Sequence, residues 1–340
     1  MTSPAGRADR NPALDFTKGA LVLFMVLYHW LNYFVSAQGF YYRYLRFLTP
    51  SFIFITGFIV SHIYLAKYGA ASRMLPGRLL LRGVKLLGIF LLLNAVRAMV
   101  MPGSGISNVL SVEWLTSNLA PFLATENQMA GSGRSAAFLI LIPISYLLLS
   151  SAGLVLFGRL HNYAIHVVGG LFLAGVFLLN LLGAKNAFLE LVSVGLLGVL
   201  LGYVSADVIA NMTRHPYLFL TAYLGYLIAI TSWDIIYPLQ VVGVFLTVVL
   251  IYTLGARDHE PGWFVQQVIL LGKYSLFGYI TQIAILQLLR RGLGTWGLET
   301  AGLVTSFFAA FALTLLSVIV ADYARAKFAV VDSMYKAVFS

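Results

Sequence analysis

A lysine and a histidine near the start of the chain have a spacing that would place them on one face of a helix. Lys18 and His29 are separated by ten residues of a largely apolar run. Eleven helical steps turn about 1100°, close to three full turns, and advance about 16 Å along the axis. We therefore expect the two side chains to share a face, with Lys18 at the cytoplasmic membrane boundary and His29 near mid-membrane.

This spacing suits a long ligand that has an anionic end. The anion could rest on Lys18 while the reactive end reaches His29, whose imidazole can take a proton from a hydroxyl near neutral pH. The structural alternative is a lysine that extends to the membrane surface and a histidine bonded to a neighbouring helix. The pattern leaves both interpretations open. Asp15, just upstream, is expected to cap the first helix.

More cations precede later apolar segments. Arg78 and Arg82 are four residues apart, so they stack on one helical face, and arginine binds phosphate through two parallel N–H groups. Taken alone, the pair is better explained as ordinary anchoring on the cytoplasmic side. Lys273 is a third candidate cation at the cytoplasmic side.

Three further polar residues are candidate substrate contacts. Tyr279 and Gln282 follow Lys273, and we expect both mainly to hydrogen-bond across helices. Asp234 could orient an acceptor sugar, a role that only its position supports. His62 is expected to be a satisfied interface histidine. The chain has no cysteine and no HExxH motif, so we expect no metal.

The composition predicts the elements that must hold these residues. Of 340 residues, 60% are hydrophobic and 10% charged, and the mean hydropathy is +0.88. A soluble domain has about 25% charged residues, and a bilayer-spanning helix needs about 20 apolar ones. We predict an all-α transmembrane bundle of about ten spans, forming a single domain over residues 1–340. The expected spans are Thr17–Ser36, Phe47–Ala66, Leu79–Met99, Ala136–Leu156, Ala164–Leu182, Phe188–Ile209, Tyr217–Thr231, Ile235–Leu254, Phe264–Leu289 and Ala301–Tyr323.

The distribution of charge predicts the orientation. With the N-terminus inside, most of the 22 Lys and Arg residues fall on the cytoplasmic side, and an even number of spans puts the C-terminus there too. Residues 1–16 are then a cytoplasmic tail and residues 100–135 an exterior loop. The net charge of +10 indicates contact with anionic membrane lipid rather than nucleic acid, since no basic run is dense enough to follow a phosphate backbone.

These residues together resemble the integral-membrane acyltransferase family of bacterial O-antigen and surface-glycan acetylases, which includes the periplasmic-glucan succinyltransferases. Lys18 and His29 match its basic residue, ten intervening residues and histidine, and the stretch Leu14–Gly19 looks like its Asp-x-x-Arg-Gly start. Arg78 and Arg82 match its paired arginines.

Two shorter motifs extend the resemblance over most of the chain. Phe54–Phe58 resembles the family's Phe-x-Ser-Gly-Phe, with Thr56 in place of serine, and Lys273–Leu276 resembles its late Ser-Tyr element. Gln282 stands where many members have a second histidine.

The resemblance implies transfer of an acyl group, acetyl or succinyl, from cytoplasmic acyl-coenzyme A to a hydroxyl of an extracytoplasmic glycan or glycolipid at a bacterial cell membrane. The donor's phosphates would lie near Lys18, Arg78 and Arg82, and its thioester near His29. His29 would deprotonate the acceptor or form a transient acyl-histidine. Acetyl-coenzyme A is the favoured co-substrate. The oligomeric state stays open.

A transporter or flippase for a lipid-linked glycan is the main alternative. An aromatic content of 14% suits contact with sugars. However, transporters often show inverted repeats and paired broken helices, and neither is clear in the sequence. A purely structural membrane subunit is the third interpretation, and it leaves the alignment of Lys18 with His29 to chance.

Overall fold

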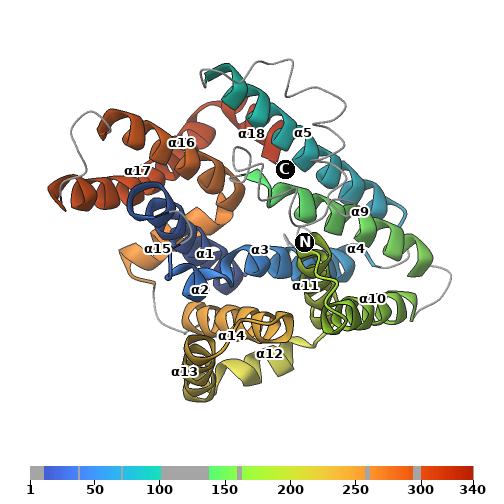
Figure 1. Cartoon of the computed structure of the whole chain (residues 1–340). Helices are drawn as coiled ribbons and strands as arrows, with labels where there is room; N and C mark the ends of the chain where they lie inside the picture. Colours follow the sequence, from blue (N-terminus) through green and yellow to red (C-terminus); the bar gives the residue numbers. More distant parts are fainter. Residues whose placement is uncertain are drawn as a thin grey trace. The chain divides into compact units, whose positions relative to one another are not determined.

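The computed structural model describes residues 11–36, 39–69, 72–100, 138–158, 163–256, 261–293 and 300–339. Every regular element in these ranges is a helix, which confirms the predicted all-α class for the described residues (Figure 1). The expected exterior loop at residues 100–135 lies outside them, except for Val100 at the end of α5. Of the expected tail at residues 1–16, the part from Pro12 onward is helical and belongs to α1.

The described helices group into two compact units, and the single domain over residues 1–340 stays a prediction. The first unit is Met1–Phe52 with Ala206–Ser340, and the second is Ile53–Ser205. The division falls within the helix α3 (Leu48–Ile59).

In the first unit, α1 packs against α14, α15, α16 and α17. It therefore has protein neighbours on several sides, and it carries both Lys18 and His29, as the spacing predicted. Besides part of α3, the elements of this unit are α1 (Pro12–Trp30), η1 (Leu31–Val35), α2 (Tyr42–Leu45), α12 (Ala206–Thr213), α13 (Pro216–Ser232), α14 (Tyr237–Gly255), α15 (Trp263–Lys273), α16 (Ser275–Leu293), α17 (Thr300–Lys327) and α18 (Ala329–Phe339).

In the second unit, α5 packs along α9, and α11 packs against α9, α10 and η2. A Cβ atom on Gly57 would overlap the carbonyl oxygen of Gly195, so α3 and α11 meet backbone to backbone. This packing explains the glycine of the Phe54–Phe58 motif. The elements are the rest of α3, η2 (Val60–Leu65), α4 (Ala66–Tyr68), α5 (Met74–Val100), α9 (Leu141–Gly158), α10 (Ala164–Leu181) and α11 (Ala187–Leu201).

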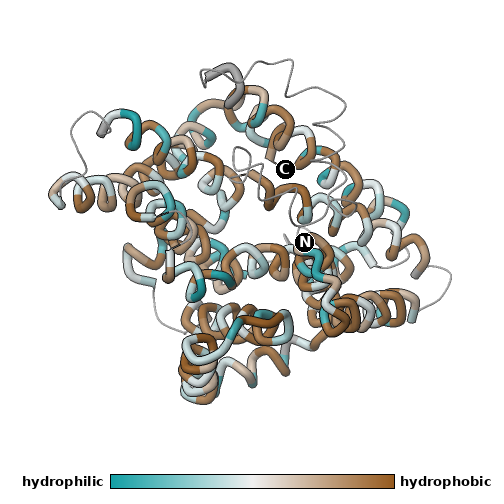
Figure 2. Tube along the Cα trace, viewed as in Figure 1, coloured by the Kyte–Doolittle hydropathy of each residue, from teal (hydrophilic) through white to brown (hydrophobic). Residues whose placement is uncertain are grey.

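Six helical segments in the described residues are long and apolar enough to cross a membrane, or seven if the bent pair α15–α16 forms one span. Figure 2 shows the apolar residues that dominate the helices. Three shorter apolar helices overlap the remaining expected spans: Leu141–Phe157, Ala187–Leu201 and Pro216–Ser232. The segments are typical of a membrane protein. The count of ten spans and the cytoplasmic placement of both termini stay predictions.

The start of α1 differs from the expectation. The N-cap is Asn11, whose side-chain oxygen accepts a hydrogen bond from the backbone N–H of Leu14, and Pro12 opens the helix. The Asn11 amide also donates to the Tyr252 hydroxyl of α14 at 2.9 Å. The predicted cap at Asp15 is therefore wrong. Asp15 lies inside the helix, where its carboxylate faces Lys18 one turn on.

Candidate functional site

His29 lies in the last turn of α1, and its side chain is enclosed by protein. Only 9% of the residue is exposed, and its Nε2 atom is fully buried without a hydrogen-bond partner among the described residues. The Tyr28 ring lies 5.2 Å from the imidazole and the Tyr279 ring 6.3 Å, between ring centroids. A buried polar nitrogen in a structural role normally has a hydrogen-bond partner, so the structural alternative leaves Nε2 unexplained.

Gln282 on α16 is a second unsatisfied polar group, with an exposed fraction of 0%. Neither its amide nitrogen nor its amide oxygen has a hydrogen-bond partner among the described residues. The expected hydrogen bond from Gln282 to another helix is therefore wrong. An uncharged amide that is buried without partners lowers the stability of the fold by about 1–3 kcal/mol, so a bound group that satisfied it would be held firmly.

The packing of α16 places Gln282 on the face that meets α1. Tyr279, Gln282 and Leu286 are three and four residues apart in turn, so they share a face of α16. The first of them lies beside His29, and Leu286 belongs to one buried cluster with Val26 of α1. Gln282 therefore lies between two points at which α16 meets α1.

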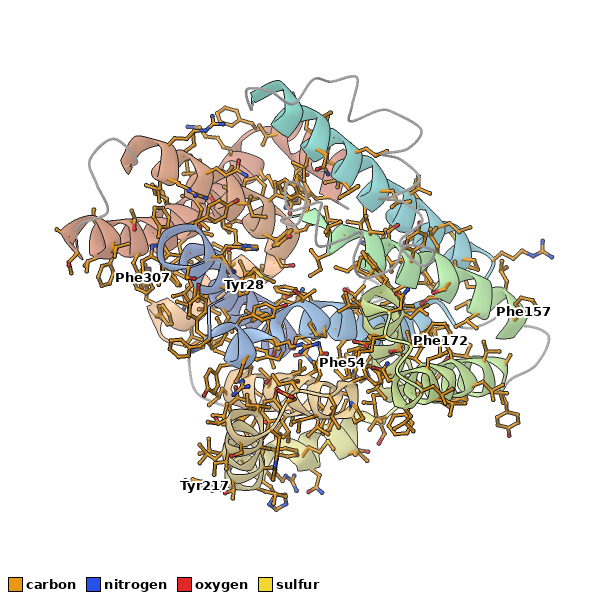
Figure 3. The ribbon with its side chains drawn as sticks, in the orientation of Figure 1. Tyr28, Phe54, Phe157, Phe172, Tyr217 and Phe307 are labelled. Carbon is orange, nitrogen blue, oxygen red and sulfur yellow. The ribbon has the colours of Figure 1, made fainter. Side chains whose placement is uncertain are left out.

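Aromatic rings connect His29 to α2, the short helix that follows α1. The Tyr42 ring on α2 lies 5.7 Å from Tyr28, which in turn lies 5.2 Å from His29. Tyr42 and Tyr28 are both partly exposed. The neighbouring Arg43 donates to the Thr231 carbonyl oxygen at 3.1 Å, which ties α2 to α13. We refer to Tyr42, Tyr28, His29 and Tyr279 as the ring path. Figure 3 labels Tyr28 within it.

Asp234 is not joined to the ring path. It lies after the end of α13, its side chain is exposed, and it makes no hydrogen bond or ion pair with any other described residue. The tie between α2 and α13 ends at Thr231, so Asp234 is near that connection in sequence. Its role in substrate binding stays a prediction.

The other end of α1 packs tightly against α15. A Cβ atom on Gly272 would overlap the Asp15 carbonyl oxygen, and one on Gly19 would overlap the Val268 carbonyl oxygen. The two backbones touch, which brings the helix that ends at Lys273 against the turn that carries Lys18. This contact explains why both positions are glycine.

The two lysines at this end differ in their surroundings. Lys18 pairs with Asp15 at 2.6 Å and is 18% exposed, whereas Lys273 is exposed. The pair of Lys18 with Asp15 has no net charge, which weakens the attraction for an anion. A lysine ammonium has three N–H donors, however, so it can bind an anion while it keeps its carboxylate partner.

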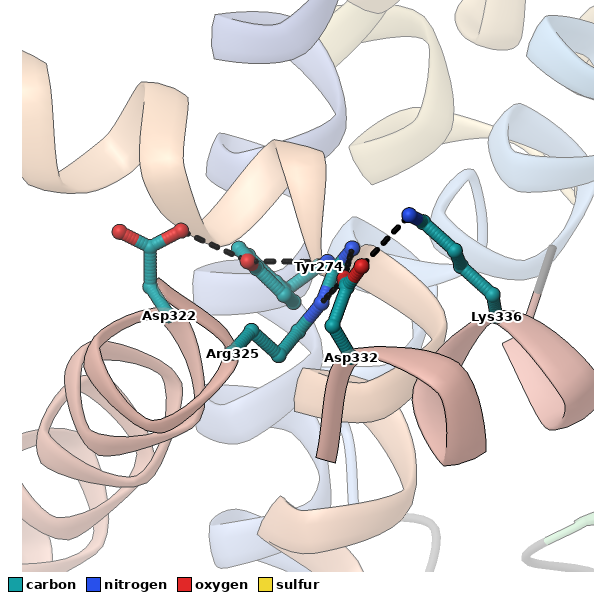
Figure 4. A network of polar contacts seen from close by, with 5 residues as sticks. All are labelled: Tyr274, Asp322, Arg325, Asp332 and Lys336. Carbon is teal, nitrogen blue, oxygen red and sulfur yellow. Dashed lines mark hydrogen bonds and ion pairs between the residues drawn. The ribbon is translucent and has the colours of Figure 1, made fainter. Parts of the chain in front are cut away.

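A bend of 95° separates α15 from α16, with Tyr274 at the break. The Tyr274 hydroxyl donates to Asp322 at 2.6 Å and accepts from Arg325 at 3.0 Å (Figure 4). Arg325 also donates to Asp332 of α18 at 2.7 Å, and Lys336 pairs with the same carboxylate at 2.5 Å. The sequence reasoning missed this network. The sequence offered two signals for it: Tyr274 follows a glycine and a lysine, and Asp322 and Arg325 lie close together at the end of the last span.

Arg78 and Arg82 belong to the second unit, where they lie on α5 and stack on tyrosines. The Arg78 guanidinium lies 4.6 Å from the Tyr68 ring centroid and bonds its hydroxyl, and Arg82 lies 4.9 Å from Tyr64. Both arginines are exposed. Stacking on a ring holds the guanidinium plane while its edge N–H groups can still reach a phosphate. Simple anchoring at a membrane surface does not require this arrangement.

His62 in the second unit has a hydrogen-bond partner, which Nε2 of His29 lacks among the described residues. Its Nδ1 lies 3.2 Å from the Gly202 carbonyl oxygen, and its ring stacks on Phe58 at 4.7 Å. This is the interface histidine that the sequence predicted. No group of three or more side chains able to hold a metal occurs in the described part of the chain.

Comparison with known proteins adds no relative. No protein-family model matches the chain, and neither a curated protein nor a solved structure does.

Proposed function

We propose that the protein is a membrane O-acyltransferase. It moves an acyl group from cytoplasmic acyl-coenzyme A to a hydroxyl of an extracytoplasmic glycan or glycolipid. One observation supports this function above the others: the buried Nε2 of His29, which belongs to the ring path, has no hydrogen-bond partner among the described residues. An imidazole nitrogen without a hydrogen-bond partner can accept the proton of a substrate hydroxyl.

In the proposed reaction, Nε2 of His29 takes the proton from the acceptor hydroxyl. The hydroxyl oxygen attacks the thioester carbonyl carbon, and the bond from that carbon to sulfur breaks. The coenzyme A thiolate leaves and takes the proton back from the imidazolium, so His29 ends the cycle neutral. A two-step route, in which Nε2 itself carries the acyl group before the acceptor attacks, is the alternative.

The proposed donor site begins with Lys18 and Lys273, which α1 and α15 bring to the same end of their shared contact. The rise of an α-helix puts Lys18 about 16 Å from His29 along α1, a distance suited to a donor whose phosphates and thioester are joined by a long flexible arm. We extend the proposal to Arg78 and Arg82, whose stacked guanidinium groups have the chemistry to bind phosphate.

For the acceptor, we propose a sugar that lies against the ring path. A pyranose ring has a C–H face that fits the face of a tyrosine, and tyrosine hydroxyls can bond its oxygens. Tyr42 and Tyr28 continue from His29 to the partly exposed side of this path. Tyr279, Gln282 and Asp234 are the further proposed substrate contacts.

The bend between α15 and α16 favours a second candidate function. Broken helices that present polar groups are characteristic of transporters, so movement of a lipid-linked glycan is the alternative. A single bent pair was found in the described residues, whereas transporters usually have two in corresponding positions.

Acyl transfer by purified protein in proteoliposomes tests the function. The vesicles receive acetyl-coenzyme A outside or inside, with surface glycan on the opposite side, and mass spectrometry measures acetyl groups on the glycan. We expect transfer by the wild-type protein and none by His29→Ala. Full transfer by the variant would refute the role of His29, and glycan movement without any donor would favour the transporter.

A further inference from the structure

We propose that Gln282 is a catalytic residue that binds the acyl carbonyl oxygen and stabilises the negative charge that develops there during transfer. This inference rests on the proposed acyltransferase function and assigns a separate role within it. The role differs from a general substrate contact because it concerns only the oxygen of the reacting carbonyl.

The first support is that Gln282 is buried with unused hydrogen-bonding groups. Its exposed fraction is 0%, and both amide atoms lack partners among the described residues. Glutamine has two N–H donors and an acceptor oxygen, so an amide in this state is an uncommon and destabilising feature of a folded protein. Such groups often occur where a ligand completes the bonding.

The second support is the location of Gln282 on α16. It lies one turn after Tyr279, whose ring is next to His29, and one turn before Leu286, which is in the same buried cluster as Val26. On α1, Val26 and His29 are likewise one turn apart. Gln282 and His29 are thus the two unsatisfied polar side chains on the facing surfaces of α1 and α16 among the described residues.

These two groups have complementary chemistry for acyl transfer. His29 can accept the proton that leaves the hydroxyl, and the amide of Gln282 can donate N–H to the carbonyl oxygen as the attack makes it negative. A neutral donor is suited to an apolar interior, where an added lysine or arginine would itself need a partner. The Gln282 oxygen can accept a hydrogen bond from the acceptor, so the bound substrates would satisfy the whole amide.

Gln282→Met tests the role because methionine keeps the shape of the side chain and removes its polar atoms. We expect kcat to fall about a hundredfold to a thousandfold, as when one donor to an oxyanion is removed, with little change in the KM for acetyl-coenzyme A. The melting temperature should stay the same or rise, because the unsatisfied amide is lost. A structural glutamine would show the reverse pattern.

Gln287→Met is the matched control on the same helix. The amide of Gln287 already donates to the Tyr33 hydroxyl at 3.4 Å, so this variant should keep the wild-type kcat. Gln282→His supplies a new N–H near the same place and should recover activity relative to Gln282→Met. It also keeps the test open if the methionine variant does not fold.

Three results would overturn the inference. The first is an unchanged kcat in Gln282→Met. The second is a loss of activity that parallels a loss of thermal stability, which is expected if the amide bonds an internal water. The third is a Gln282→His variant that is no more active than a folded Gln282→Met variant. If Gln282→Met is fully active while His29→Ala is inactive, only this inference fails. If the wild-type protein transfers no acyl group, the proposed function fails first.

Discussion

His29 and His62 show how differently two histidines of one chain can be used. His62 bonds the Gly202 carbonyl oxygen and stacks on Phe58, so its ring has partners within its own unit. His29 is more deeply buried, yet its Nε2 has none among the described residues. A hydrogen bond to the facing backbone helps to hold a helix interface, whereas a buried nitrogen without a partner can accept a hydrogen bond from a ligand. We propose that this difference distinguishes a structural imidazole, His62, from a catalytic one, His29.

Replacing each histidine by leucine is the strongest test of this comparison. We expect His29→Leu to lower acyl transfer by about 10²–10⁴-fold, since a general base contributes that much, while the melting temperature holds. His62→Leu should lower the free energy of unfolding by about 1–2 kcal/mol through the lost hydrogen bond and keep the kcat of the folded protein. Thermal melts and transfer assays on both variants measure this. The same response at both positions would remove the distinction.

The close glycine contacts allow the same comparison between the helix packing of the first unit, at Gly272, and that of the second, at Gly57. Gly272→Ala forces α15 away from α1, and Gly57→Ala forces α3 away from α11. Each should destabilise its unit by about 1–3 kcal/mol, the usual effect of overpacking. We expect only Gly272→Ala also to raise the donor KM, because it moves Lys273 relative to Lys18. Gly77→Ala, where a Cβ atom meets no neighbour, is the control.

The stacked arginines sharpen the comparison on the donor side. Arg78→Ala and Arg82→Ala should each raise the KM for acetyl-coenzyme A about tenfold to a hundredfold, since a charge-assisted hydrogen bond contributes about 1.5–3 kcal/mol. Arg73→Ala, an exposed arginine upstream of the pair, should leave the KM unchanged. If the donor KM is the same in all three variants, the pair serves only to anchor α5.

Asp332 provides the smallest test, because like His62 it has polar partners within its own unit. Hydrogen bonds from Lys336 and Arg325 lower the pKa of its carboxyl below the ordinary value. A lowered pKa in the folded state stabilises the contact of α18 above the unfolded pKa, about 3.9, and this contribution is lost as pH falls through the folded pKa. The contact should therefore hold at neutral pH and weaken only in acid.

A spin label can follow α18, since the chain contains no cysteine to compete. With Met334→Cys labelled, electron paramagnetic resonance should show a helix that becomes more mobile only at a pH below the pKa of an ordinary aspartate, about 3.9, because the pKa of Asp332 is lowered in the folded protein. Asp332→Asn should be slightly more mobile at neutral pH and should lose this pH dependence. Equal mobility from neutral to acid pH in both proteins would mean that Asp332 does not hold α18.

The sequence predicted the features that depend on local periodicity. The helical class, the placement of Lys18 and His29 on one helix, and the shared face of Arg78 and Arg82 follow from spacing, and the structure has them. Apolar runs likewise locate most helices, because a long run is a signal that many residues share and that no single residue can hide.

Features that depend on what lies opposite a side chain could not be predicted. Nothing in the sequence around Gln282 tells whether α1 offers its amide a partner, and it does not. Asn11 caps the helix in place of Asp15 because the helix starts about one turn earlier than expected, at Pro12. The Asn11 amide also donates a hydrogen bond to Tyr252 of α14, a partner that the local sequence does not reveal. Tyr274 at the bend hydrogen-bonds Asp322 and Arg325, which are far away in sequence.

The network at Tyr274 has a practical consequence for handling the protein. Arg325 bonds both the tyrosine at the bend and Asp332 of the last helix, so α18 is mechanically linked to the segment that carries Lys273. A purification tag fused close to the end of α18 would strain these hydrogen bonds. A truncation at Lys327 would remove Asp332 and with it the bond from Arg325 to α18. Affinity handles are therefore better attached ahead of α1, and a donor-binding defect seen with a C-terminal fusion should be attributed first to the fusion.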